Sequence, residues 1–272
     1  MTDKLQTFRE MELAGWEEKA SAYDVYAGKI TPQAVAPLLN ATGVEAGMMV
    51  LDIATGPGYA AGGAHSRGAI ATGIDFSGAM VAQAKRNHPD ALFYEGDAES
   101  MLFPNGFFDA AVCPFGLLHL SNPEKAVAEA FRVLRRGGKY AFTVWAPPER
   151  HKFFELVLSA IATHGSTDVT LPEAPPFFRF SDPAECRKIL SSNGFTDIEV
   201  TEIPLSWRPD HHQQVLDLIY KSSVRTAKLL ELQNETARNN IHTHILDRAR
   251  QLIESDGELA WPAVLAVATK PD

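Results

Sequence analysis

The sequence predicts an α/β fold in which a mainly parallel sheet is covered by helices on both faces. Short apolar runs alternate with segments of helical periodicity along the 272 residues, a pattern typical of parallel sheets. A glycine turn, Gly56-Pro57-Gly58, follows the first apolar run. Acidic residues stand near the ends of three successive predicted strands, at Asp52, Asp75 and Asp97. Together these observations predict a ligand site at one edge of the sheet.

Seven strands are expected in chain order. Each is a run of mostly apolar or β-branched side chains, and their ranges are 48–53, 69–75, 91–95, 107–113, 138–145, 196–205 and 259–269. The clearest helix is predicted at 123–135, where Val127, Ala130 and Leu134 recur at a spacing of three or four residues and Asn122 can cap the first turn. We expect this apolar stripe to face the sheet.

The glycine turn indicates a nucleotide-type cofactor. Gly56 and Gly58 lack side chains that would hold a ligand away from the backbone, and a helix that begins near Pro57 would direct free N–H groups toward it. The same run also fits the nicotinamide dinucleotide fingerprint, which permits a final alanine. The glycines alone therefore leave two cofactor classes open.

The acids favour one of these classes. Asp75 follows Asp52 by 75 − 52 = 23 residues, close to the spacing of an acid that accepts both hydroxyls of a ribose. Asp52 could accept an ammonium group, and Asp97 could accept from an adenine amine. A cofactor with an amino acid end, a ribose and an adenine, but no phosphate, would use all three acids.

At these residues the chain resembles the class I S-adenosylmethionine-dependent methyltransferases, particularly the small-molecule branch that includes ubiquinone and menaquinone biosynthesis methyltransferases. The motifs that carry the resemblance appear in order as LDIATGPG, TGIDFS, EGDAESMLFPNGFFDAAVC and HLSNPEKAVAEAFRVLRRGGKYAFTVW. It implies a Rossmann-like sheet of seven strands with an antiparallel edge strand, S-adenosylmethionine as cofactor and methyl transfer to a small molecule. The family usually has glycine where this chain has Ala54.

Candidate site residues follow from the motifs and from their places on the predicted fold. The predicted cofactor contacts are Tyr23, Asp52, Ala54, Gly56, Gly58, Asp75, Phe76, Asp97, Ala98 and Cys113. His119 follows the fourth strand and is the candidate catalytic base and a substrate contact, although it could instead order the loop before the next helix. The other predicted substrate contacts are His151, Phe177, Phe178 and Trp207. No metal site is expected, because the neighbouring histidines of the chain would point in different directions on a helix.

The expected methyl transfer needs few catalytic groups from the protein. The cofactor carries its own leaving group, so holding an acceptor in line with the methyl group supplies much of the rate enhancement, up to about 7–11 kcal/mol. An acceptor with a bound proton, such as a phenol, also benefits from a base. Oxygen, carbon and nitrogen all remain open as the accepting atom.

The elements divide the chain into four expected parts. These are an N-terminal helical cap at 1–45, a cofactor-binding core at 46–146, a lid insertion at 147–190, and C-terminal core strands at 191–272 with inserted lid helices at 208–256. Ligands of open α/β sheets bind beyond the carboxyl ends of the strands. The aromatic lid should cover that edge and hold a hydrophobic or aromatic small molecule.

Composition narrows the class of partner. The net charge of −9 and the lack of a clustered basic segment argue against nucleic acid. The N-terminus lacks the apolar core of a secretory signal, and no run of about 18 apolar residues suggests a membrane span. A cytoplasmic enzyme is therefore expected, with monomer and homodimer both open.

Three other functions share these motifs. A nicotinamide-dependent oxidoreductase would have the same glycine turn. An enzyme of this fold could also bind the sulfonium cofactor as a scaffold and catalyse a non-methyl reaction such as cyclisation. A third possibility is a module that senses the cofactor without turnover.

Overall fold

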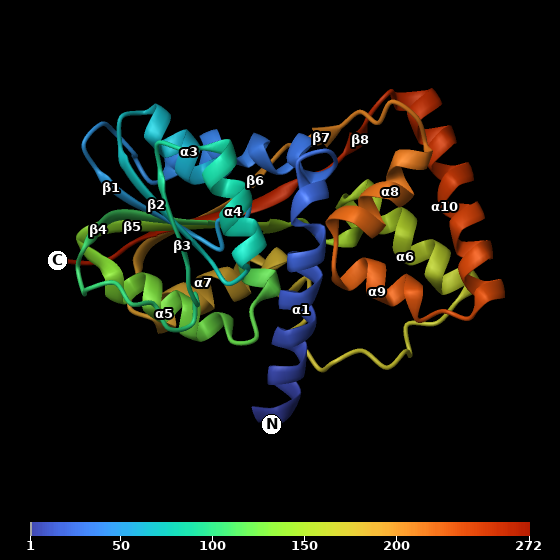
Figure 1. The fold of residues 1–272 in the computed structure, drawn as a ribbon, viewed down its shortest axis with the longest axis horizontal. Coiled ribbons are helices and arrows are strands. Elements are labelled where there is room, and N and C mark those ends of the chain that lie inside the picture. Colours follow the sequence, from blue (N-terminus) through green and yellow to red (C-terminus); the bar gives the residue numbers. More distant parts are fainter. Residues whose placement is uncertain (1) are drawn as a thin grey trace.

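The computed structural model describes residues 2–272, with side chains described from Gln6 onward. Figure 1 shows a sheet with helices on both faces and a second group of helices beside it. The long N-terminal helix α1, Thr2–Tyr23, stands between these two parts and contacts helices of both. Three layers and a helical lid therefore make up the molecule.

The central sheet has seven strands in the order β3-β2-β1-β4-β5-β9-β6. Their bounds are β1 Met49–Ile53, β2 Ile70–Asp75, β3 Leu92–Glu95, β4 Phe108–Pro114, β5 Leu134–Trp145, β6 Thr196–Ile203 and β9 Ala263–Thr269. The first five strands pair in parallel, whereas β9 runs antiparallel to both β5 and β6. The predicted seven-stranded, mostly parallel sheet is confirmed.

The last two strands differ in position for a reason visible in their sequences. β9 is buried along nearly its whole length, as expected of a continuous apolar run between two neighbouring strands. β6 carries Glu199 and Glu202 and is largely exposed, which suits the outer edge of a sheet. The antiparallel strand is therefore second from the edge.

The predicted strand at 259–269 is interrupted. Pro262 cannot donate a ladder hydrogen bond, and the structure divides the segment into β8, Leu259–Ala260, and β9. β8 pairs with β7, Ser206–Trp207, in a separate two-stranded sheet that the sequence did not predict.

Alternate residues of the central strands belong to two separate apolar clusters, one on each face of the sheet. Val50 of β1 packs with helices α2 Val35–Ala41, α3 Tyr59–Ser66 and α4 Gly78–Asn87. Leu51 packs on the other face with α5 Pro123–Val133 and α7 Pro183–Ser192. This two-residue period is the one expected of a sheet covered on both sides. The predicted helix at 123–135 is α5, and its Asn122 side chain accepts a hydrogen bond from Lys125 N at 3.0 Å, as expected of a cap.

Four helices form the lid, namely α6 Lys152–His164, α8 Gln213–Ser222, α9 Arg225–Glu231 and α10 Glu235–Asp256. They pack mainly on one another, with α10 against α6 and α8. The predicted lid segment 147–190 is therefore divided, because α6 lies in the lid whereas α7 packs against β6 and β9. Short 3-10 helices complete the chain at Ala27–Lys29 (η1), Thr31–Ala34 (η2), Leu117–His119 (η3), Pro148–Arg150 (η4) and Arg179–Ser181 (η5).

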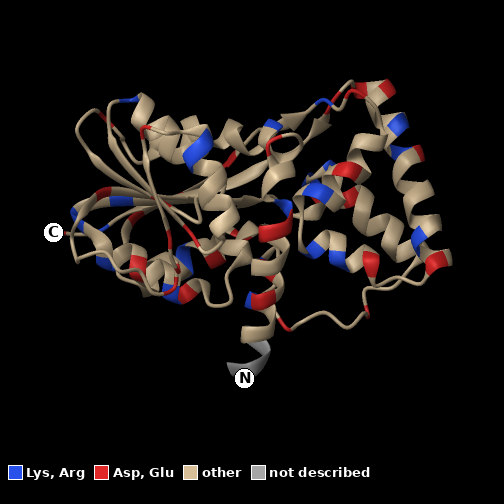
Figure 2. Cartoon of the chain, viewed as in Figure 1, with Lys and Arg blue, Asp and Glu red and all other residues tan. Residues whose placement is uncertain are grey.

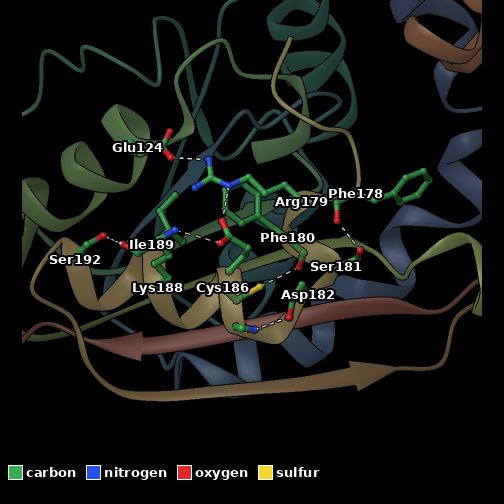
Figure 3. Close-up of polar contacts among 12 residues, drawn as sticks. Glu124, Phe178, Arg179, Phe180, Ser181, Asp182, Cys186, Lys188, Ile189 and Ser192 are labelled. Atoms are coloured by element: carbon green, nitrogen blue, oxygen red, sulfur yellow. Dashed lines mark hydrogen bonds and ion pairs between the residues drawn. The ribbon is translucent and has the colours of Figure 1, made fainter.

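The segment between lid and sheet is anchored by polar contacts around η5 (Figure 3). Arg179 forms ion pairs with Glu124 of α5 and with Glu185 of α7. Asp182 caps α7 by accepting from Ala184 N at 2.8 Å. Because these contacts hold η5 on the sheet side, the aromatic residues just before it are carried to the rim of the lid. Figure 2 shows acidic and basic residues interspersed over both halves of the molecule.

We expect Gly73→Ala to destabilise the fold. A β-carbon at Gly73, in the middle of β2, would lie 2.6 Å from Thr55 Oγ1 and 2.7 Å from the Phe93 ring. Overpacking of this kind costs about 1–3 kcal/mol. Urea denaturation should show the loss as a lower midpoint. Gly96→Ala is the matched control, because its β-carbon would approach Ile74 only to 3.9 Å. Equal midpoints for the two variants would contradict the packing described for β2.

Candidate cofactor and substrate site

A large cavity lies at the carboxyl ends of the parallel strands, beneath α1 and the lid. The strand ends contribute Ala54, Asp75, Asp97, Phe115 and Trp145 to its lining. Its empty volume is about 1280 Å³ when the space that opens to solvent is included.

The glycine turn forms one wall. Ala54, Gly56 and Gly58 all have left-handed backbone, with φ of 54°, 51° and 87°. Gly56 lines the cavity, and a β-carbon there would meet nothing within 4 Å. The turn thus leaves open space where a side chain would otherwise stand. Ala54 adopts this conformation despite its β-carbon, at a cost of about 1–2 kcal/mol, which is why glycine suits the position.

Asp75 ends β2 and faces the cavity. Its Oδ2 accepts a hydrogen bond from Gly56 N at 2.8 Å, and its Oδ1 accepts from Ser77 N at 2.9 Å. Burial raises the pKa of this carboxyl to about 6, although the two N–H donors act in the opposite direction. A carboxylate oxygen can accept two hydrogen bonds, so each oxygen can still accept one from a ligand. This geometry fits a pair of ribose hydroxyls.

Asp52 has a different position from the predicted one. It is fully buried, it is not part of the cavity lining, and its Oδ2 accepts from Thr55 Oγ1 at 2.6 Å and from Ala61 N at 2.9 Å. Its Oδ1 has no hydrogen-bond partner among the described residues. Burial is the main cause that raises its pKa to about 7. The carboxyl therefore ties the glycine turn to α3 from behind, and the predicted ammonium contact needs another group.

Asp97 lines the cavity beyond β3, together with Ala98. Its Oδ1 accepts from Glu99 N at 2.8 Å, and its Oδ2 forms an ion pair with Arg9 Nη1 at 2.7 Å. Arg9 comes from α1 and also lines the cavity. The sequence did not predict this residue, because nothing in the charge pattern of 1–20 distinguishes it from its neighbours.

α1 also supplies a buried acid to His119. The Nδ1 atom of His119 lies 2.9 Å from Glu12 Oε2, and Trp16 Nε1 donates to the same oxygen at 3.0 Å. Glu12 is fully buried, and its Oε1 has no partner in the part of the chain that the structure describes. The Trp16 ring stands edge-on to the imidazole with centroids 4.9 Å apart. His119 therefore has a defined orientation on the cavity wall.

Tyr23 lines the cavity near the end of α1, and Phe76 lines it just after β2. The Tyr23 hydroxyl lies 3.5 Å from Thr31 Oγ1, and burial raises its pKa to about 12. The phenol is therefore neutral near pH 7, and its O–H group donates to Thr31 over this long contact. Both residues lie where the sequence predicted cofactor contacts.

Aromatic rings line the rest of the cavity. Phe115 stacks on Trp145 with centroids 3.9 Å apart, and further rings come from Phe153, Phe154, Phe177 and Trp261. Trp261 stands two residues before β9. It reaches the site because β9 runs antiparallel, so that the start of β9 lies at the carboxyl ends of the other strands. Of this set, Phe177 is one of the substrate contacts predicted from the sequence.

Several predicted contacts stand behind the cavity wall. These are Gly58, Cys113, His151, Phe178 and Trp207, none of which lines the cavity. A β-carbon at Gly58 would lie 2.8 Å from the Phe93 ring, so this glycine serves packing. Burial raises the pKa of the Cys113 thiol to about 12. The His151 imidazole is buried among Trp145, Trp261 and Phe154, which lowers its pKa to about 3 and excludes it as a base near neutral pH.

Comparison with known proteins identifies the core. Residues 51–142 match the family described as a methyltransferase domain. Over this segment the chain is similar to the methyltransferase domain family. The matched segment includes Asp75, Asp97 and His119, whereas α1 and the lid lie outside it. The resemblance seen in the sequence motifs is thereby confirmed.

Curated relatives and solved structures agree with this domain. A demethylmenaquinone methyltransferase of Paenarthrobacter aurescens is 28% identical over 193 residues, which is 65% of this chain and 76% of the relative. One of Beutenbergia cavernae is 38% identical over 41% of this chain and 48% of its own length. The YcgJ protein of Bacillus subtilis aligns over 88% of this chain and 99% of its own, with a TM-score of 0.58 and 21% identity. The chain thus spans about three quarters of the first relative and about half of the second.

Between residues 2 and 272, no helix combines the length and apolar character needed to cross a bilayer. The described side chains contain no group of three or more histidine, cysteine or acidic residues arranged to hold a metal ion.

The burial of Asp52 predicts a specific pH dependence. Its pKa of about 7 in the folded chain lies above the ordinary value of 3.8 for an aspartic acid, so the folded chain retains a proton that the unfolded chain releases between these limits. Wild-type stability should therefore fall relative to Asp52→Asn as pH rises from 4 to 7, by up to about 1.4 kcal/mol per pH unit. Denaturant unfolding at several pH values measures the difference. Asp90→Asn, at an exposed position, should leave the profile unchanged. Parallel profiles for wild type and Asp52→Asn would contradict the burial.

Proposed function

We propose that this chain transfers the methyl group of S-adenosylmethionine to a hydrophobic aromatic small molecule, for which a quinol-like ring is the best candidate. The observation that carries the proposal is one cavity in which Asp75 and the open glycine turn adjoin an aromatic chamber and His119. Two relatives are named demethylmenaquinone methyltransferases, and this supports a ring of this type. We further propose that the enzyme acts in the cytoplasm and without nucleic acid.

The residues present fit the cofactor. Asp75 would accept the ribose hydroxyls, Asp97 and Ala98 lie where an adenine would bind, and Gly56 leaves space for the ligand. Tyr23 offers a neutral hydroxyl for the amino acid end. When bound, S-adenosylmethionine supplies an activated methyl group and a thioether leaving group.

The chain's own contribution would be orientation, exclusion of water and proton removal. The rings of Phe115, Trp145 and Phe177 can hold a flat acceptor and exclude solvent around it. Glu12 engages Nδ1 of His119, which leaves Nε2 as the nitrogen free to accept a proton from the acceptor. A buried carboxylate beside the ring also stabilises the imidazolium that forms. His119 is the proposed catalytic residue, and Glu12 is a positioning residue.

The first test is cofactor binding. Calorimetry should detect S-adenosylhomocysteine binding to the wild type, with affinity rising from pH 5 to pH 7.5 because the Asp75 carboxyl, with a pKa of about 6, ionises over this range and then accepts from the ribose. Asp75→Asn should weaken binding about tenfold or more and remove the pH dependence. Asp210→Asn removes a charge at the exposed surface and should have no effect. Binding of NAD in place of S-adenosylhomocysteine would overturn the proposal.

The second test is transfer itself. Incubation with deuteromethyl S-adenosylmethionine and a panel of naphthols and quinols should give a labelled product by mass spectrometry. Tight cofactor binding with no labelled product from any aromatic acceptor would instead favour a non-methyl reaction on the same scaffold.

Variants of His119 and Glu12 test the proposed proton transfer. His119→Ala should lower kcat about 10²-fold or more while S-adenosylhomocysteine affinity stays unchanged. Glu12→Gln should lower kcat less, because the imidazole remains but loses its charged partner. Glu10→Gln, on the exposed side of the same helix, is the matched control. Joint loss of kcat and cofactor affinity in His119→Ala would show that the histidine only orders the loop.

A further inference from the structure

Arg225 has a position that neither the methyltransferase motifs nor the proposed mechanism accounts for. It is the first residue of α9, it lines the same cavity as His119, and it lies outside the matched domain at 51–142. Its guanidinium carbon lies 5.4 Å from the centroid of the Phe8 ring and 5.1 Å from that of the Phe177 ring. Cation–π contacts with these two rings help to hold the group in place.

This guanidinium is partly buried and has few partners among the described residues. Among the described residues no carboxylate lies within 4.0 Å of it, and its one hydrogen bond is a long one from Nη1 to Pro175 O at 3.3 Å. By contrast, Arg9, Arg132 and Arg179 each have a carboxylate at 2.7 Å or less. A guanidinium carries five N–H donors, and buried charges are ordinarily paired. Most of the donors of Arg225 are therefore left for a ligand.

The nearest candidate acid within the chain has other partners. Glu12 acts on Arg225 through space, but its Oε2 binds His119 and Trp16. Phe177 contacts both Arg225 and the His119 ring, the latter with centroids 6.5 Å apart. Arg225 and His119 thus flank the same aromatic ring, at the acceptor end of the cavity.

We propose that Arg225 binds a carboxylate on the methyl acceptor, so that the substrate is an aromatic acid whose ring lies in the aromatic chamber. The planar fork of a guanidinium matches the two oxygens of a carboxylate. The rings around it supply the apolar surface for the rest of the molecule. This inference rests on the proposed function and narrows its substrate class.

The test compares an acid with its neutral isostere. The probes are 1-hydroxy-2-naphthoate and 1-hydroxy-2-naphthamide, titrated by calorimetry into enzyme saturated with S-adenosylhomocysteine. Wild type should bind the acid about tenfold to a hundredfold more tightly than the amide. Arg225→Gln should abolish this preference and leave amide affinity unchanged, and Arg225→Lys should restore part of it. Arg248→Gln, an exposed arginine of α10, is the control.

Any one of four results would overturn the inference. Equal binding of acid and amide to the wild type, or no binding of the acid at millimolar concentration, removes the carboxylate site. An unchanged preference in Arg225→Gln, with lowered stability, shows that Arg225 only offsets the charge of Glu12. If Arg225→Gln binds S-adenosylhomocysteine more weakly but binds 5′-methylthioadenosine, which lacks the amino acid end, as tightly as the wild type does, Arg225 is assigned to the cofactor carboxylate. Failure of S-adenosylhomocysteine to bind the wild type would instead contradict the proposed function.

Discussion

The site depends on two buried carboxyl groups that hold the glycine turn from opposite sides. Asp75 accepts from Gly56 N on the cavity side, while Asp52 accepts from Thr55 and Ala61 behind the turn. These hydrogen bonds keep the left-handed backbone of the turn in place and the β1 tip open. Without them the chain would lose the concave wall against which a ligand can lie. Both carboxyls are buried in this arrangement, which disfavours their charged forms and raises the pKa of each.

α1 contacts both the lid and the residues at the strand ends. Lys19 Nζ donates to Tyr220 O of the lid at 2.8 Å, and Glu17 accepts from Ala79 N at the start of α4. The same helix carries Arg9 to Asp97 and Glu12 to His119. One element thus joins the lid to the core and also supplies charged partners to residues of the matched domain.

Residues of the lid line a large part of the cavity. Its helices pack mainly on one another and present aromatic rings and one guanidinium to the space above the strand tips. Phe177 reaches that space because η5 is fastened to α5 and α7 by Arg179. An apolar chamber with few polar groups selects by shape and by the placement of those groups. Most of the aromatic residues that line the cavity therefore lie outside the matched segment, whereas Asp75, Asp97 and His119 lie within it.

The sequence by itself determined where most strands lie along the chain, the glycine turn, and the positions of Asp75 and Asp97 at strand ends. These features depend on local periodicity, turn chemistry and short spacings. It placed His119 on the correct wall for the same reason. Only the tertiary structure decided that Asp52 faces inward, since one residue of register turns a strand side chain to the opposite face. The pairing of Glu12 with His119, 107 residues apart, and the aromatic surroundings of Arg225 were likewise beyond the sequence. Both sets of contacts form where helices from distant parts of the chain pack over the sheet. A local sequence pattern does not specify which helix faces will be in contact.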